Sequence, residues 1–125
     1  LLTGATSADL VPFMLRELAE GGPGLDRLYT ALIGPTHARL CALWQLATGE
    51  PAESEAVKLR VFSLVGQLLY FRIGAPVICR RLDWPAIGEA ELSAITATLT
   101  ANLTAALGPL KDAVMLCSLP LIATL

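Results

Sequence analysis

The sequence is poor in charge. Only 16% of its 125 residues are charged, and nine lysines and arginines against eleven aspartates and glutamates give a formal net charge of −2. The densest basic point is the Arg80–Arg81 doublet, so no basic stripe is available to hold a phosphate backbone. We therefore expect this chain alone to bind neither DNA nor RNA.

The sequence also lacks the common catalytic and phosphate-binding motifs, and it has one histidine, His37. Its three cysteines, Cys41, Cys79 and Cys117, are far apart and match no disulfide framework or zinc spacing, so we interpret them as small buried side chains in a reducing compartment. His37 and Cys41 stand four residues apart, a spacing that can hold a metal or activate a thiolate, but no carboxylate is near them in sequence. We expect no enzymatic activity, no metal and no cofactor.

Long apolar runs are missing as well. A membrane span needs about 20 consecutive apolar residues, and the candidates 61–73 and 113–125 are short and interrupted by polar residues or proline. No basic segment precedes an apolar one at the start, so no signal peptide is expected. We predict a cytoplasmic protein with no membrane partner. The apolar tail 113–125 needs a groove or partner to cover it, and its role stays open.

Apolar residues, by contrast, are abundant, and they recur at helical spacing. Apolar residues make up 54% of the chain and the mean hydropathy is +0.62, which predicts one folded domain and excludes disorder. Apolar residues recur at helical spacing, and no segment keeps a period of two. The prediction is an all-α fold, a bundle of orthogonal and antiparallel helices. The expected helices cover about residues 9–20, 25–47, 53–73, 76–82 and 89–107, the first capped by Asp9 with Pro12 in its first turn.

Two of these helices carry unusual features. Gly34–Pro35 falls in the middle of the second helix, which should be bent or broken there. In the third helix, Ser63, Gln67 and Tyr70 form one polar line in a segment that is apolar almost all round. That line is either a polar seam inside a helix interface or a stripe that faces a ligand. In the first helix, Arg16 is likewise either a solvated side chain or a specificity residue.

The helix at 89–107 has two apolar stripes, one bulky and one of small residues that allows a close helix approach. Two buried faces on one helix predict packing against its own domain and against a second subunit, as in an intersubunit four-helix bundle. We therefore predict a homodimer formed by the helices near 53–73 and 89–108. Its expected interface residues are Val61, Leu64, Leu68, Ala94, Ala97, Ala101 and Ala105.

Several stretches resemble the C-terminal domain of TetR/AcrR-family transcriptional regulators of the CecR-like branch. The resemblance covers about residues 9–110. Asp83 stands where the family pattern has glycine before the tryptophan, and residues 114–125 have no counterpart in it. The stretches that carry the resemblance are 63–72 (SLVGQLLYFR), 75–77 (APV) and 81–84 (RLDW), together with 13–20 (FMLRELAE) and 33–37 (IGPTH).

The resemblance implies an effector-binding and dimerisation domain, residues 1–112, of a one-component regulator that is most often a repressor. It implies a small, largely apolar effector, and DNA contact only through an N-terminal helix-turn-helix domain that is absent from this chain. The alternative is a helical oligomerisation module without a ligand. Ligand residues are proposed because they are large or polar side chains on apolar faces: Met14, Arg16, Tyr29, His37, Trp44, Gln67, Tyr70 and Phe71.

Overall fold

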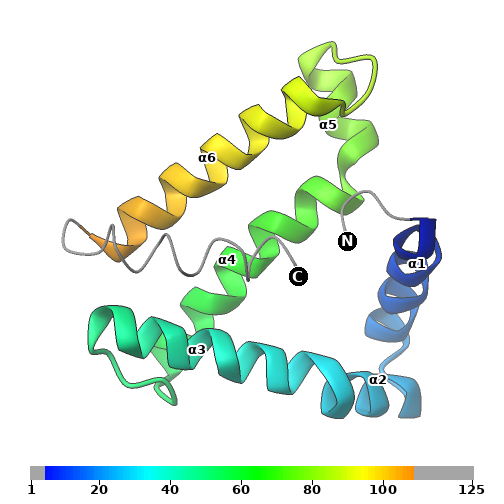
Figure 1. Cartoon of the computed structure of the whole chain (residues 1–125). Helices are drawn as coiled ribbons and strands as arrows, with labels where there is room; N and C mark the ends of the chain where they lie inside the picture. Colours follow the sequence, from blue (N-terminus) through cyan, green and yellow to red (C-terminus); the bar gives the residue numbers. More distant parts are fainter. Residues whose placement is uncertain (1–4, 109–125) are drawn as a thin grey trace.

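The computed structural model describes residues 5–108, with side chains from residue 11 onward, and within this range the all-α prediction is confirmed (Figure 1). The predicted tail 113–125 and Cys117 lie outside the described residues. The elements in chain order are α1 (Ala5–Glu20), α2 (Pro23–Leu28), the π-helical turn η1 (Tyr29–Ile33), α3 (Gly34–Thr48), α4 (Glu55–Ile73), α5 (Ala75–Leu82) and α6 (Glu89–Leu107).

Helix α4 is the central element, because it contacts α3, α5 and α6, while α1 contacts α2 at the other end of α3 (Figure 1). Local sequence explains where α4 and α6 begin. The Ser54 hydroxyl accepts a hydrogen bond from the Val57 N–H at 3.3 Å and so caps α4. At the start of α6, the Glu91 carboxylate accepts the Gly88 N–H at 3.1 Å.

The core lies where α3, α4 and α6 meet. It contains Cys41 and Trp44 from α3, Val57 and Val61 from α4, and Leu103 from α6. These side chains are spaced three or four residues apart within α3 and within α4, so each helix contributes one stripe. The core is therefore small and is built by three segments that are distant in sequence.

The first helix differs from its prediction. The chain is already helical at Ala5, so Asp9 is not an N-cap, and Pro12 lies inside α1 and not in its first turn. A proline in a helix removes one backbone hydrogen bond and crowds the preceding turn, but the residues before it can still be helical. The Asp9 signal therefore does not mark the start of this helix.

The helix is not broken at Gly34–Pro35. The helical path runs from α2 into α3 through the wider turn η1, where the Gly34 N–H bonds to the Tyr29 carbonyl five residues earlier. A π turn gives the proline ring room that an α-helical turn does not. Glycine suits position 34, since a Cβ atom there would lie 3.1 Å from both the Tyr29 carbonyl oxygen and the Tyr29 ring.

The turn after α5 depends on Asp83. This residue adopts the left-handed conformation, with φ 55° and ψ 35°, and its N–H bonds to the Cys79 carbonyl. The following Trp84 N–H bonds to the same carbonyl at 2.9 Å. The position thus has the geometry for which glycine is the usual residue, and aspartate is one of the few others that tolerate it.

We predict that Asp83→Ala lowers the free energy of unfolding by about 1 kcal/mol, whereas Asp83→Gly leaves it unchanged or raises it slightly. Alanine has a Cβ but no side-chain oxygen with which to stabilise the left-handed backbone. Urea denaturation measures both variants, with the slope of the transition expected to stay constant. Equal stability of the alanine and glycine variants would contradict the proposed role of backbone conformation.

Candidate functional site

The structure distributes the predicted ligand residues over four elements. On α1, Met14 is half-buried and Arg16 is exposed, with its guanidinium carbon 5.8 Å from the centre of the Phe13 ring. Tyr29 lies exposed in η1. The remaining five are His37 and Trp44 on α3, and Gln67, Tyr70 and Phe71 on α4.

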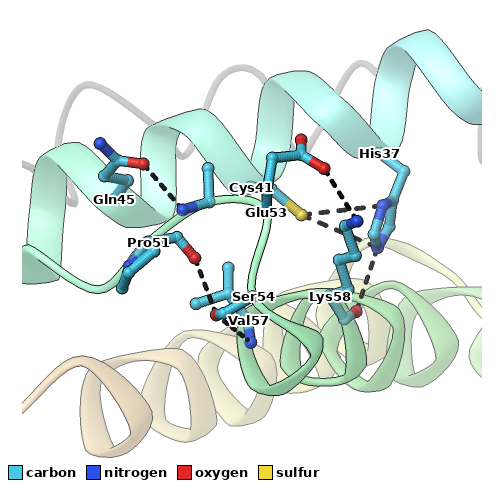
Figure 2. Close-up of polar contacts among 9 residues, drawn as sticks. His37, Cys41, Gln45, Pro51, Glu53, Ser54, Val57 and Lys58 are labelled. Atoms are coloured by element: carbon cyan, nitrogen blue, oxygen red, sulfur yellow. Dashed lines mark hydrogen bonds and ion pairs between the residues drawn. The ribbon is translucent and has the colours of Figure 1, made fainter.

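His37 lies between α3 and α4 (Figure 2). Its Nε2 atom is 3.1 Å from the Lys58 carbonyl oxygen, so this nitrogen carries the proton and donates. The other ring nitrogen, Nδ1, is then an acceptor, and the Cys41 sulfur lies 3.7 Å from it. The ring also stacks on Phe62, with centroids 3.8 Å apart. His37 therefore joins the two helices, with its ring nitrogens directed at partners in the same chain.

Cys41 is held as a neutral thiol. It is 1% exposed, and burial is the main cause that raises its pKa, followed by the nearby Glu53 carboxylate. A metal ligand or nucleophile needs the opposite, a lowered pKa. No group of three or more metal-binding side chains occurs within the described part of the chain. The His37–Cys41 spacing is thus used for packing and a weak hydrogen bond.

We predict that Cys41 reacts with iodoacetamide at least about tenfold more slowly than the half-buried Cys79 at pH 8, because a buried thiol must wait for the helices to open. Mass spectrometry of the labelled peptides separates the two sites. Equal labelling rates for Cys41 and Cys79 would contradict the burial.

The raised pKa of Cys41 also makes folding stability depend on pH. The thiol loses its proton at a lower pH in the unfolded state than in the folded state. The contribution of Cys41 to the free energy of unfolding is therefore complete below the unfolded-state pKa, and it is lost as pH rises through the folded-state pKa.

Trp44 is a core residue. It is 5% exposed, and its indole N–H donates to the Glu50 carboxylate at 2.6 Å. The Arg60 guanidinium carbon lies 5.5 Å from the ring centre, a cation–π distance. The ring and the indole N–H of Trp44 therefore both have partners within the chain, and little of the side chain is left to contact a ligand.

Gln67 has a partner on another helix. The Asn102 side-chain amide on α6 donates to the Gln67 carbonyl oxygen at 2.8 Å. The contact joins α4 to α6 across 35 residues of sequence. Of the two interpretations of the polar line, this bond favours the seam within a helix interface.

A groove of about 450 Å³ runs between α4 and α6 at this bond. Arg60, Ser63 and Gln67 give it a polar lining on α4, while Asn102 and Ala106 line the α6 side. Tyr70 is not among the residues that line it, although it lies one turn beyond Gln67. Sequence reasoning missed Arg60 and Asn102, because nothing in their local spacing places them opposite the polar line.

Comparison with known proteins identifies the family. Residues 1–110 match the family described as "HTH-type transcriptional dual regulator CecR, C-terminal domain". The chain belongs to the CecR C-terminal domain family. It is 29% identical over 103 residues to the "HTH-type transcriptional dual regulator CecR" of Shigella flexneri, an alignment that covers 82% of this chain and 46% of that protein. The chain thus spans less than half the length of this relative. No solved structure matches it.

The predicted dimer residues differ in how far they are exposed. Val61 is 3% exposed and belongs to the core of its own chain, so its side chain is not available to a second subunit. The prediction for Val61 has to be corrected, because a helix that is apolar almost all round does not reveal which stripe faces inward. Leu64 and Leu68 are half-buried, whereas all four predicted alanines of α6, Ala94, Ala97, Ala101 and Ala105, are exposed.

The exposed face of α6 is made of small side chains. An open hollow of about 980 Å³ follows this face. This face of α6 therefore has no bulky side chain over most of its length. A second helix can approach closely only at such a surface. Its lining residues are Glu89, Leu92, Ser93, Thr96, Ala97, Thr100, Ala101, Thr104 and Ala105.

Helix α4 also has an exposed apolar stripe, which we call the α4 stripe: Leu59, Phe62, Leu69, Tyr70 and Ile73. Its members recur at helical spacing, and each is at least 42% exposed, Leu59 reaching 61%. Gly66 lies in the middle of the stripe, where a Cβ would meet nothing within 4 Å. Five large apolar side chains in one row are unusual on a free surface.

Among the described residues, no single helix is long and apolar enough to cross a membrane. Helices α4 and α5 taken together pass that test by length and composition only, with a bend of 74° between them.

Proposed function

We propose that this chain is the effector-binding and dimerisation domain of a bacterial, cytoplasmic TetR-family transcriptional regulator. The observation that carries the proposal is the family match over residues 1–110, joined to a helical fold. The relative from Shigella flexneri is named a dual regulator with a helix-turn-helix. By analogy, we infer that DNA contact belongs to an N-terminal helix-turn-helix domain outside this chain, and that the whole protein represses transcription until an effector binds. Residues 1–112 form the proposed domain.

The proposed dimer pairs α4 and α6 with their copies across a two-fold axis, giving an intersubunit four-helix bundle. The α4 stripe and the small-residue face of α6 support this pairing. Leu59 and Phe62 are 61% and 51% exposed in the single chain, and a second subunit would remove such apolar surface from water. Ala97 and Ala101 on α6 would allow the backbones to come close.

The proposed effector is small and largely apolar. Of the eight ligand residues predicted from sequence, Met14, Arg16, Tyr29, Tyr70 and Phe71 remain the proposed contacts. They combine aromatic and apolar surface with one cation, which suits an aromatic molecule that carries a polar group. Trp44, His37 and Gln67 use their polar atoms inside the chain and are assigned supporting roles.

The alternative is a helical oligomerisation module with no effector. It is favoured by the internal hydrogen bonds of His37 and Trp44, and by the Gln67 carbonyl oxygen, which is already paired with Asn102 and is not free for a ligand. A dimer is expected under both proposals, and only the response to small molecules separates them.

The experiment has two parts. Light scattering and sedimentation should give a dimer at micromolar concentration, and a monomer there would contradict both functions. Thermal unfolding is then followed with rhodamine 6G, ethidium and 1-naphthol as probes. A probe at a hundredfold excess over its dissociation constant stabilises the fold by about 2.7 kcal/mol, or roughly 10 °C for a domain of this size. A saturable shift supports the effector-binding domain, and a dimer that no aromatic or cationic probe shifts supports the module.

A further inference from the structure

The Gln67–Asn102 pair is incompletely used within one chain. Asn102 donates through Nδ2 to Oε1 of Gln67 at 2.8 Å. An amide side chain has both a donor and an acceptor end, so this bond leaves the Gln67 nitrogen as a donor and the Asn102 oxygen as an acceptor. Gln67 is half-buried and Asn102 is exposed. Both remaining groups are therefore within reach of something outside the chain.

The surroundings of the pair are mostly apolar or small. The pair lies in the groove between α4 and α6, with Leu59 on one wall and Ala106 on the other. Leu59 also belongs to the α4 stripe, and on α6 the groove residues Asn102 and Ala106 directly follow Ala101 and Ala105 of the small-residue face. An apolar partner that covered this face would bury an amide donor and an amide acceptor without hydrogen bonds, which is unfavourable.

A second copy of the same chain avoids that penalty. In a two-fold dimer the same patch lies on both sides, so a residue that contacts another is contacted in return. The Gln67 nitrogen then donates to the partner's Asn102, and the partner's Gln67 donates back. Each chain thus has one unused amide donor and one unused amide acceptor, and the two chains can satisfy each other. Few other occupants of the groove would offer a matching donor and acceptor.

We propose that the Gln67–Asn102 pair is the polar recognition element of the homodimer, with a second copy of this chain as its partner. The inference rests on the dimerisation part of the proposed function and adds which residues fix the pairing. A buried amide pair in an apolar helix interface sets register and partner choice, because a shifted or unrelated partner leaves the amides unpaired.

The decisive variant is Gln67→Glu. Its carboxylate still accepts from Asn102, so the bond between α4 and α6 is kept, but at neutral pH it has no N–H to give to the partner. Sedimentation equilibrium should then show a dimer dissociation constant raised about tenfold or more. Urea unfolding of the variant at a concentration where it is monomeric should resemble that of the parent monomer. Gln45→Glu is the matched control, since Gln45 likewise accepts one hydrogen bond, from the Ala52 N–H at 2.7 Å, but at the α3–α4 loop.

A second pair of variants tests the complementarity. Gln67→Leu leaves Asn102 without its partners and should weaken the dimer about tenfold. Adding Asn102→Leu removes the unpaired amide, so the double variant should recover the parental affinity to within a few-fold. A brace that acts only within one chain would instead lower unfolding stability and leave dimer affinity unchanged.

The outcomes separate the two proposals. A parent protein that is monomeric at micromolar concentration overturns the proposed dimer and this inference with it. A parent dimer whose affinity is unaffected by Gln67→Glu overturns this inference alone. A tenfold loss confined to Gln67→Glu, with Gln45→Glu unchanged, is the expected result.

Discussion

Replacing Trp44 with alanine is expected to lower the free energy of unfolding by about 3–5 kcal/mol. The side chain is 5% exposed and packs in the small core with Cys41, Val57, Val61 and Leu103. Its loss leaves a cavity at the junction of α3, α4 and α6, and these helices have few other buried contacts with which to compensate. Small domains are stable by about 5–15 kcal/mol in total, so this loss is a large fraction of the stability and should lower the thermal midpoint by about 10 °C or more. Circular dichroism during thermal and urea unfolding measures the effect.

Two controls separate packing from polar contacts. Trp44→Phe keeps an aromatic ring but loses the bond to Glu50, so we expect a smaller loss of about 1–2 kcal/mol. Leu46→Ala, on the same helix but 80% exposed, should change stability by less than about 0.5 kcal/mol. If Trp44→Ala were no more destabilising than Leu46→Ala, the core would have to lie elsewhere.

The helical class and most helix positions could be predicted from sequence, because they depend on local signals. The last helix was predicted at 89–107, and α6 spans Glu89–Leu107, with acidic residues at its start and glycine after its end. Serine and acidic residues near position 54 marked the start of α4 in the same way. Capping and stop signals act within one or two turns, so they are legible without knowledge of the fold.

The features that could not be predicted depend on contacts between distant residues. Gln67 stood out as polar in an apolar segment, but its partner Asn102 is 35 residues away, and no spacing rule connects them. Likewise, the near-continuous apolar character of 61–73 concealed that Val61 faces the core while Leu69 and Tyr70 face outward. Periodicity identifies a face only where the opposite face is polar.

The turn at Gly34–Pro35 shows a second limit of prediction from sequence. Sequence reasoning correctly identified a disturbance there, because proline cannot complete the α-helical hydrogen bond and crowds the preceding turn. The structure accommodates it with one π turn over Tyr29–Ile33 instead of a break. The two solutions differ in which carbonyl receives the Gly34 N–H, and the Gly–Pro signal alone does not specify that carbonyl.

The second large effect is expected at the small-residue face of α6: Ala101→Arg should raise the dimer dissociation constant at least about a hundredfold, equivalent to about 3 kcal/mol. Ala101 is exposed in the single chain and lines the open hollow along α6, so arginine should not disturb the fold of the monomer. In the proposed bundle, however, a close helix crossing at this position has room for neither the volume nor the charge of arginine. Ala97→Arg should act in the same way, four residues earlier on the same face.

Ala42→Arg supplies the matched control for this prediction. Ala42 is an exposed alanine on α3, outside the α4–α6 face, and the change adds the same charge and bulk. Sedimentation equilibrium of the three variants should give a monomer for the two α6 substitutions and a parental dimer for Ala42→Arg, all with parental helix content by circular dichroism. A dimer that tolerates arginine at both Ala97 and Ala101 would show that α6 faces solvent in the assembly. The two-fold pairing would then have to use the α4 stripe without α6, since Leu59, Phe62 and Leu69 would still form a row of exposed apolar side chains on that helix.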